Sequence, residues 1–375
     1  MRVLVVNAGS SSLKASVLDD DRQVDAVALE RWDGGADVAE LADLAARCSP
    51  FDAVGHRVVH GGPDHTGPAV LDEALEAELR ALTDLAPLHQ PRALSGIDAA
   101  RRLLPDVPAV ACFDTAFHRT LPPAAATYAL PAAWNERWGL RRYGFHGLSH
   151  AYATARAAEI VQQPLADLRV VSCHLGAGAS LCAVRGGVSV DTTMGFTPLA
   201  GLVMATRSGS VDPGMLLWLL DHGVSRDELA EALEHGAGMA GLSGTSGDLR
   251  DVRAAAAGGS AAAALAYDVF VHRLCREAAA MAAAAGGLDL LVLTGGIGEH
   301  DTAVRRDVAD RLAFLGVTLS TAANESASGD ADIGSPSAGV RTVVVTARED
   351  LQIAREVRAL LASSRREGHD QVSDA

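Results

Sequence analysis

The chain has few cysteines, few aromatic residues and no long apolar run. Its five cysteines are scattered over 375 residues without a CxxC pair, which is typical of reduced thiols rather than of a disulfide framework or a zinc site. The longest apolar stretch, residues 278–293, is rich in alanine and broken by Gly286 and Gly287, so it is unsuited to crossing a bilayer. Only Val3 to Val6 precede Asn7 as an apolar run, which is too short for a signal peptide. We expect a cytoplasmic protein without a membrane partner.

Positive charge is also scarce. The formal net charge is −15, and a protein that binds nucleic acid generally needs a basic face, so we expect no nucleic-acid partner. An acidic protein can bind an anion only by concentrating its few cations locally. Segments that place an arginine, lysine or histidine beside glycines are therefore informative.

Short β-type runs alternate with helical stretches rich in alanine and leucine, which indicates an α/β protein. The strand candidates are residues 2–6, 53–59, 108–113, 168–173, 288–293 and 341–346. Polar residues follow these runs, and ligands of α/β sheets usually bind at strand ends. At 375 residues, two domains are expected.

Residues 5–18, VVNAGSSSLKASVL, and residues 172–184, SCHLGAGASLCAV, are similar to each other. When Asn7 is set over His174, Gly9 falls on Gly176, and both stretches have a strand–turn–strand pattern. This similarity predicts two related domains that face one cleft.

The first of these hairpins suits a phosphate. After the Gly9 turn, alternation places Ser10, Ser12 and Lys14 on one face and the apolar residues on the other. Hydroxyls, turn amides and an ammonium can together hold a phosphate, although no Walker sequence is present. A solvated polar hairpin is the alternative interpretation.

Three further segments bring cations into glycine-rich surroundings. Arg57 lies in GHRVVHGG (55–62), His146 in YGFHGLSH (143–150), and Arg207 in TPLAGLVMATRSGSVDPG (197–214). Asp114 and Glu349 follow β-type runs, where a carboxylate suits either a Mg²⁺ ion or a helix N-cap.

Taken in order, these segments resemble the acetate kinase family over almost the whole chain. The matching segments are VNAGSSSLK, GHRVVHGG, LAPLHQP, FDTAFH, YGFHGLSH, CHLGAGAS, TPLAGL, TRSGSVDPG, LSGTSGDLRD and GGIGE. The resemblance implies an α/β, duplicated actin/sugar-kinase-like (ribonuclease H-like) two-domain fold with a central cleft. It implies a first domain of residues 1–117 and 350–375, a second of residues 118–349, and a homodimer.

The implied reaction is the reversible, in-line transfer of a phosphoryl group from ATP to acetate, giving ADP and acetyl phosphate, with Mg²⁺ or alternatively Mn²⁺. The resemblance assigns catalysis to Asp114, Arg57, Arg207, His146 and His174. It assigns the metal to Asn7 and Glu349 with Asp114. It assigns the acyl pocket to Arg57, Val59, Leu88, Phe145 and Pro198. It assigns the nucleotide to Ser10, Ser12, Lys14, His174, Gly176, Ala177, Gly178, Asp248, Leu249, Arg250, Gly295, Gly296, Ile297, Gly298 and Glu299.

The acyl pocket is bulky at every matched position, which favours acetate over longer acids. A propionate kinase with the same chemistry is the alternative, and Val59 is the residue that separates the two. A butyrate kinase fits less well, and a chaperone-like or other non-metabolic ATPase of the same superfold is a different class. The chain departs from the family at Ala177, Ala200, Leu249 and Arg348, which leaves nucleotide preference open.

Overall fold

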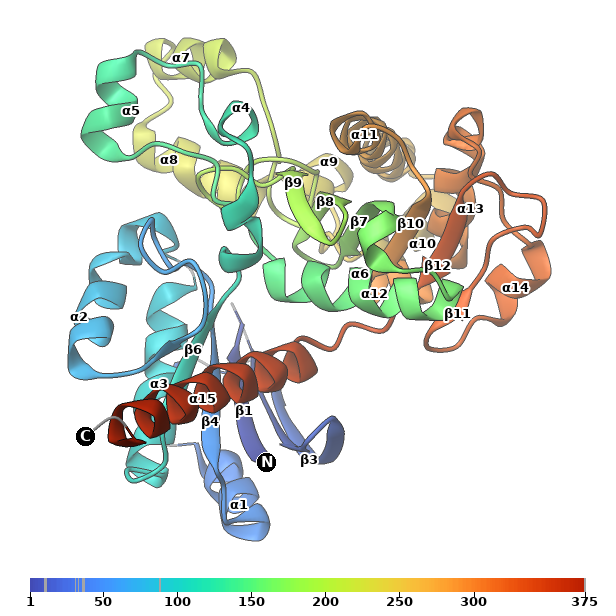
Figure 1. Ribbon diagram of the computed structural model, residues 1–375. Helices are drawn as coiled ribbons and strands as arrows, with labels where there is room; N and C mark the ends of the chain where they lie inside the picture. The colour runs from blue at the N-terminus through green and yellow to red at the C-terminus, as the bar shows by residue number, and fades with distance from the viewer. Residues whose placement is uncertain (10–11, 31, 33, 36–37, 88, 374–375) are drawn as a thin grey trace. The chain divides into compact units, whose positions relative to one another are not determined.

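The computed structural model in Figure 1 describes residues 1–9, 12–30, 32, 34–35, 38–87 and 89–373. Contacts between residues divide the chain into two units. The first comprises residues 1–119, 145–152 and 348–375, and the second comprises residues 120–144 and 153–347. Residues 118–119, 145–152 and 348–349 thus belong to the first unit, whereas the boundaries expected from the sequence placed them in the second.

The first unit contains a six-stranded sheet in the order β3-β2-β1-β4-β6-β5. Strands β1 (Arg2–Ala8), β2 (Ser12–Asp19) and β3 (Arg22–Glu30) form an antiparallel meander. Strand β4 (Ala53–Val58) runs parallel to β1, and β6 (Ala109–Phe113) runs parallel to β4. The short strand β5 (Ala69–Val70) pairs antiparallel with β6. The carboxyl ends of β1, β4 and β6 therefore lie at the same edge.

Helices cover both faces of this sheet. Helix α3 (Gln90–Leu103) packs on one face, where Ile97 joins Val58 in the core. Helix α15 (Glu349–Ser373) packs on the other, so close that a Cβ at Gly55 would lie 2.6 Å from Ile353. Successive residues of β4 thus face different helices, which explains why the strand is buried along almost its whole length. The remaining helices are α1 (Ala39–Cys48), α2 (Glu73–Ala81) and the 3₁₀ turns Thr83–Leu85 and Ala116–Thr120.

The second unit repeats the sheet of the first. Its order is β11-β12-β10-β7-β8-β9, in which β7 (Arg169–Leu175), β8 (Ala179–Arg185) and β9 (Val188–Thr192) form the meander. Strand β10 (Leu290–Thr294) runs parallel to β7, β12 (Arg341–Val344) parallel to β10, and β11 (Ala331–Asp332) antiparallel to β12. Each strand has its counterpart in the first sheet. The predicted duplicated α/β fold is confirmed.

The helices of the second unit begin where the sequence supplies caps. Asp212 accepts a hydrogen bond from the Gly214 N–H at the start of α7 (Pro213–Asp221), and Ser225 and Glu228 form a capping box at the start of α8 (Arg226–Glu231). The others are α4 (Pro123–Ala126), α5 (Ala132–Trp138), α6 (Gly147–Val161, which starts in the first unit), the π-helical turn Ala232–Gly236, α9 (Gly238–Ser243), α10 (Leu249–Ala257), α11 (Ala261–Ala285), α12 (Gly295–His300), α13 (Thr302–Arg311), α14 (Thr321–Ser326) and the 3₁₀ turns Leu165–Asp167 and Ala313–Leu315. Within the described part of the chain, no helix is both long and apolar enough to cross a membrane.

Candidate functional site

Polar side chains meet at the carboxyl ends of the three parallel strands in the first unit. Asn7 lies near the end of β1, Arg57 near the end of β4, and Asp114 directly after β6. Arg57 donates from Nη2 to Oδ2 of Asp114 at 2.6 Å and from Nε to Oδ1 at 3.0 Å. This paired geometry fixes the plane of the guanidinium.

Glu349, the first residue of α15, completes this cluster. Its Oε2 lies 3.3 Å from Nη1 of Arg57 and accepts a 2.8 Å hydrogen bond from Nδ2 of Asn7. Asp114 is 1% exposed, and the side chains of Arg57 and Glu349 are each 14% exposed. Burial disfavours the charged guanidinium, but the carboxylates of Asp114 and Glu349 outweigh it and raise the pKa of Arg57. Arg57 therefore stays charged.

The loop before α6 is fitted closely to Asp114. The Gly147 N–H donates to the Asp114 carbonyl at 2.9 Å, and a Cβ at Gly147 would lie 2.2 Å from that oxygen. His146 has a φ of +56°, in the left-handed region, and its backbone N–H bonds to the Asp114 carboxylate. The glycine-flanked turn thus places His146 beside the Arg57 cluster.

Residues expected in the acyl pocket are divided between the two units. Val59 and Phe145 are buried in the first unit, where the His60 ring meets the Phe145 ring edge-on with centroids 5.5 Å apart. Pro198 belongs to the second unit. Leu88 lies outside the described residues, as does Ser10 of the first hairpin.

The first hairpin has the predicted alternation. Leu13, Ala15 and Val17 are buried, while Lys14, the only lysine of the chain, is exposed and pairs across the strands with Asn7. The Gly9 N–H donates to the Ser12 carbonyl at 2.8 Å, which closes the turn. Lys14 therefore lies on β2 directly opposite Asn7, which belongs to the Arg57 cluster.

A cavity of about 720 Å³ lies in the second unit. Its walls come from the β7–β8 turn, the segment 246–251 and α12. The predicted nucleotide residues that line it are Gly176, Ala177, Asp248, Leu249, Arg250, Gly296 and Ile297. The cavity has the size of an ordinary small-molecule site.

Other predicted nucleotide residues stand beside the cavity without lining it. Gly295 has a φ of +77°, and a Cβ there would lie 2.8 Å from the Leu175 carbonyl, so the turn from β10 into α12 requires glycine. Gly178 accepts a hydrogen bond from the Gly176 N–H at 3.1 Å. Glu299 accepts from the Ala347 N–H at 3.0 Å through its carboxylate, which ties α12 to the chain before α15. Gly298 is buried in α12, and Nε2 of His174 would lie 3.9 Å from a Cβ at Gly176, which lines the cavity.

Arg207 is a half-buried cation of the second unit. Its Nε lies 3.6 Å from the Glu234 carboxylate, and its Nη1 donates to the Pro198 carbonyl at 3.3 Å. Burial lowers the pKa of Arg207, and Glu234 partly opposes this effect. The side chain is only 14% exposed, so its charge acts in a poorly hydrated setting.

Arg305, which no sequence motif indicates, supports the loop at the start of α12. It is 1% exposed, and its guanidinium donates to the carbonyls of Glu299 at 2.6 Å and Gly298 at 3.2 Å. It also donates to Oδ1 and the carbonyl of Asn324, both at 2.7 Å. A single arginine in a helical pattern usually lies at the surface, so no local signal could have singled it out.

Comparison with known proteins places the chain in one family. A model of the acetokinase family matches residues 38–355. The acetate kinase of Synechococcus sp. is 43% identical, with 96% of this chain and 99% of that one covered, and the acetate kinase of Nostoc punctiforme is 44% identical, with 94% and 86% covered.

Solved structures agree over the same length. The crystal structure of Porphyromonas gingivalis acetate kinase has a TM-score of 0.86 at 34% identity and covers 96% of this chain and 99% of its own. A propionate kinase from Francisella tularensis has the same TM-score at 35% identity, with 95% and 98% covered. Family model, sequence and fold thus coincide along nearly the whole chain, and the chain belongs to the acetokinase family.

Proposed function

We propose that this protein is an acetate kinase, which transfers the γ-phosphoryl group of ATP reversibly to acetate and gives ADP and acetyl phosphate. The observation that carries the proposal is the Arg57 cluster, in which two carboxylates hold one buried guanidinium at the carboxyl edge of a sheet. The curated relatives described above are acetate kinases. A propionate kinase is structurally just as similar, so the acid has to be decided by the acyl pocket.

Arg57 binds and orients the acid in this proposal. Asp114 occupies Nε and one N–H of Nη2, and Nη1 lies 3.3 Å from both Asn7 Oδ1 and the Glu349 carboxylate, so the guanidinium is held in place. We assign the second N–H of Nη2 to the substrate carboxylate. Val59 and Phe145 bound the methyl group. Holding the attacking oxygen in position is a large part of catalysis for an in-line displacement.

Stabilisation of the transferred group needs charge rather than covalent chemistry, since the three oxygens of the phosphoryl group carry the developing charge. We assign this role to Arg207, with hydrogen bonds from His146 and His174. The hydroxyls of Ser10 and Ser12 and the ammonium of Lys14 hold phosphate at the first hairpin. Gly176 and Gly178 let backbone approach phosphate at the second.

The oxygen donors of the first unit fit a magnesium ion. The described residues contain no group of three or more histidines, cysteines and carboxylates that could hold a metal by itself. Mg²⁺ or Mn²⁺ bound to phosphates needs only one or two carboxylates, because water and phosphate supply the other ligands. Asn7, Glu349 and Asp114 would hold it. When bound, the ion neutralises phosphate charge.

The cavity of the second unit takes the nucleoside of ATP or ADP. Leu249 and Ile297 offer apolar surface to the base, and Asp248 with Arg250 forms the polar side. Ala177 has no polar side chain to add a contact to phosphate or ribose. The choice between purine nucleotides then depends on Asp248, Arg250 and the backbone of 246–251.

Acyl phosphate formation, trapped as the hydroxamate, tests the proposal directly. With ATP and Mg²⁺, acetate is expected to give a higher kcat/KM than propionate, and butyrate the lowest. A higher kcat/KM with propionate than with acetate would support the same phosphoryl transfer but make the protein a propionate kinase. ATP hydrolysis without any hydroxamate would indicate an ATPase of the same superfold instead.

Val59→Ala is expected to shift preference towards propionate. The substitution removes two methyl groups from a buried wall, and one methylene in such a pocket is worth about 1–3 kcal/mol, or roughly tenfold or more in the kcat/KM ratio. Val58→Ala is the matched control, because Val58 packs against α3 on the other face of β4. An unchanged ratio in the Val59 variant would remove this residue from the acyl pocket.

Arg305→Leu is expected to weaken nucleotide binding and stability together. It leaves the carbonyls of Gly298, Glu299 and Asn324 without their donor, and one buried unsatisfied group costs about 1–3 kcal/mol. KM for ATP should rise more than kcat falls, measured by kinetics and by urea unfolding. Arg306→Leu, on the exposed neighbour, should change neither. Normal nucleotide affinity in the Arg305 variant would mean that the loop holds its shape unaided.

We propose that the protein forms a homodimer through an apolar surface of the second unit. Leu217 and Trp218 of α7 are 64% and 56% exposed, and Met215 and Leu220 of the same helix are also exposed. Large apolar patches of this kind mark interaction sites. Trp218→Glu is expected to yield monomers in light scattering after gel filtration. Phe314→Glu, at a position 75% exposed, is the control and should leave the dimer intact; a dimeric Trp218 variant would place the interface elsewhere.

A further inference from the structure

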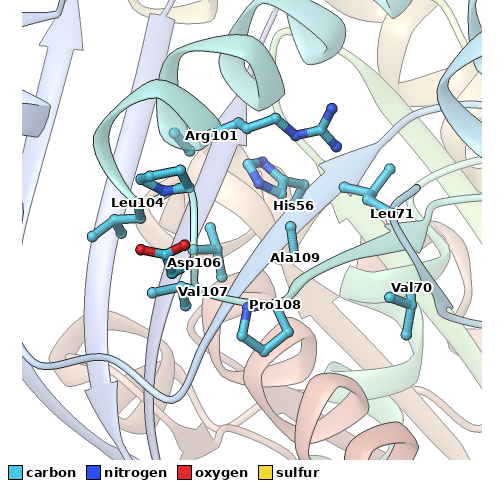
Figure 2. Close-up of a pocket in the computed structure, with 12 residues that line it drawn as sticks. His56, Val70, Leu71, Arg101, Leu104, Asp106, Val107, Pro108 and Ala109 are labelled. Atoms are coloured by element: carbon cyan, nitrogen blue, oxygen red, sulfur yellow. The ribbon is translucent and has the colours of Figure 1, made fainter. Parts of the chain in front are cut away.

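A second cavity lies in the first unit, on the α3 side of its sheet. It has a volume of about 300 Å³ and is bounded by β4, the strands β5 and β6, and the turn between α3 and β6. Figure 2 shows Arg101 above His56, with Leu71 beside them and Val70 and Pro108 further down. None of its lining residues takes part in the Arg57 cluster.

His56 gives this cavity a polar group that the fold itself does not use. The side chain is 2% exposed, and its Nε2 has no hydrogen-bond partner among the residues that the structure describes. Burial, with the nearby positive charge of Arg101, lowers the pKa of His56 to about 3, so the imidazole is neutral at ordinary pH. A buried nitrogen without a partner is costly, and such groups call for a specific explanation.

Arg101 supplies positive charge next to that imidazole. Its side chain comes from α3, is 39% exposed and pairs with Glu76. In Figure 2 it passes over the His56 ring and ends above Leu71, whereas the Asp106 carboxylate lies on the other side of the ring. The cavity thus has a hydrogen-bonding end beside the Arg101–Glu76 ion pair, and its other walls include the apolar residues Val54, Leu71, Val107 and Pro108 together with Asp106.

We propose that this cavity is a binding site for a small organic carboxylate. The ligand's carboxylate accepts a hydrogen bond from Nε2 of His56 and lies beside the Arg101 guanidinium, and its apolar body packs against Leu71, Val107 and Pro108. A volume of about 300 Å³ is at the lower end for ligand sites, which limits the ligand to a small acid.

This site is distinct from the proposed acetate site. His56 and Arg57 are consecutive residues of β4, and consecutive side chains of a strand point to opposite faces of the sheet. Val54 and Val58, which share the face of His56, pack against residues of α3. Arg57 instead contacts Glu349 of α15 on the opposite face. The second site stands whether or not the protein phosphorylates acetate.

Benzoate is the probe for the test, and benzamide is its neutral counterpart of the same shape. The Cε1–H signal of His56, assigned as the one lost in His56→Leu, is followed by NMR during titration with saturating acetate present, so that an acetate site is already filled. Benzoate is expected to shift this signal saturably and at least tenfold more tightly than benzamide. No saturable shift, or equal affinity for the two probes, would overturn the proposal.

Variants locate the bound probe. Ala109→Leu extends a lining side chain into the cavity and is expected to lower benzoate affinity at least tenfold, whereas Ala26→Leu on the exposed strand β3 should leave it unchanged. His56→Leu is expected to raise Tm, because it removes an unpaired buried nitrogen, and to abolish benzoate-dependent stabilisation. Should Ala109→Leu not fold, Arg101→Met takes its place and should remove the preference for benzoate over benzamide. Benzoate affinity retained in the His56 and Arg101 variants would refute the site.

Discussion

Arg57→Ala is expected to reduce kcat/KM for acetate at least a thousandfold and to lower the free energy of unfolding by about 3–5 kcal/mol. Removing one member of a buried ion pair leaves an uncompensated charge, and here both Asp114 and Glu349 would lose their cation. The acid would at the same time lose its charged hydrogen-bond partner. Steady-state kinetics and urea unfolding, at a temperature where the variant remains folded, measure the two effects.

Arg57→Lys separates charge from geometry. It keeps a cation near Asp114 but cannot make the two-pronged contact that Nε and Nη2 make with the carboxylate. Compared with Arg57→Ala, the free energy of unfolding should therefore return closer to the wild-type value than kcat/KM does. Arg47→Ala, which removes an exposed pair with Asp25 in the same unit, is the control for loss of any arginine and should leave the unfolding midpoint unchanged. An Arg57→Ala variant with wild-type stability and less than a tenfold loss of activity would contradict both parts of the prediction.

Local patterns were enough to predict the α/β class and the two hairpins. The burial of Leu13, Ala15 and Val17 follows from alternation along one strand, which a short stretch of sequence records. The matching strand orders of the two sheets follow from the similarity between residues 5–18 and 172–184. Such features depend on neighbours in the chain.

The Arg57 cluster could be predicted only in part. Asn7, Arg57 and Asp114 end parallel strands, so their meeting at one edge is expected once the strands are paired. Glu349 bonds to Asn7 across 342 positions of sequence, and no periodicity connects two such distant residues. The role of Glu349 was inferred from family resemblance. The structure gives the physical reason, because α15 packs on the first sheet and places its first residue, Glu349, beside Asn7.

Buried polar residues outside motifs could not be found from the sequence. Arg305 and His56 lie in ordinary helix and strand patterns. Only tertiary packing determines that Arg305 donates hydrogen bonds to buried carbonyls and that His56 lines a cavity. The segment 145–152 is similar, because its assignment to the first unit depends on the contact of Gly147 with Asp114. Long-range packing, rather than propensity, determines these features.

Arg207→Ala is expected to lower kcat by about a thousandfold or more, as arginines that stabilise phosphoryl transfer do, while KM for acetate and for ATP change little. The Glu234 carboxylate at 3.6 Å and the Pro198 carbonyl at 3.3 Å help to hold the side chain in place, and we expect it to act on the charge that develops in the transition state rather than on the bound substrates. Its charge is poorly hydrated, and such a charge stabilises a developing phosphoryl charge more strongly than one in bulk water. Single-turnover kinetics would measure the effect on the chemical step itself.

Two controls decide whether that loss reflects charge at the reacting phosphate. Glu234→Gln removes the ion-pair partner and leaves Arg207 in place, so kcat should stay within a few-fold of wild type. Added guanidinium ion should restore part of the activity of Arg207→Ala, because the variant leaves a space where a soluble cation of the same shape can bind. A loss below tenfold with the fold intact would mean that another group stabilises the transferred phosphoryl. A loss that appears in KM for ATP instead of kcat would assign Arg207 to nucleotide binding.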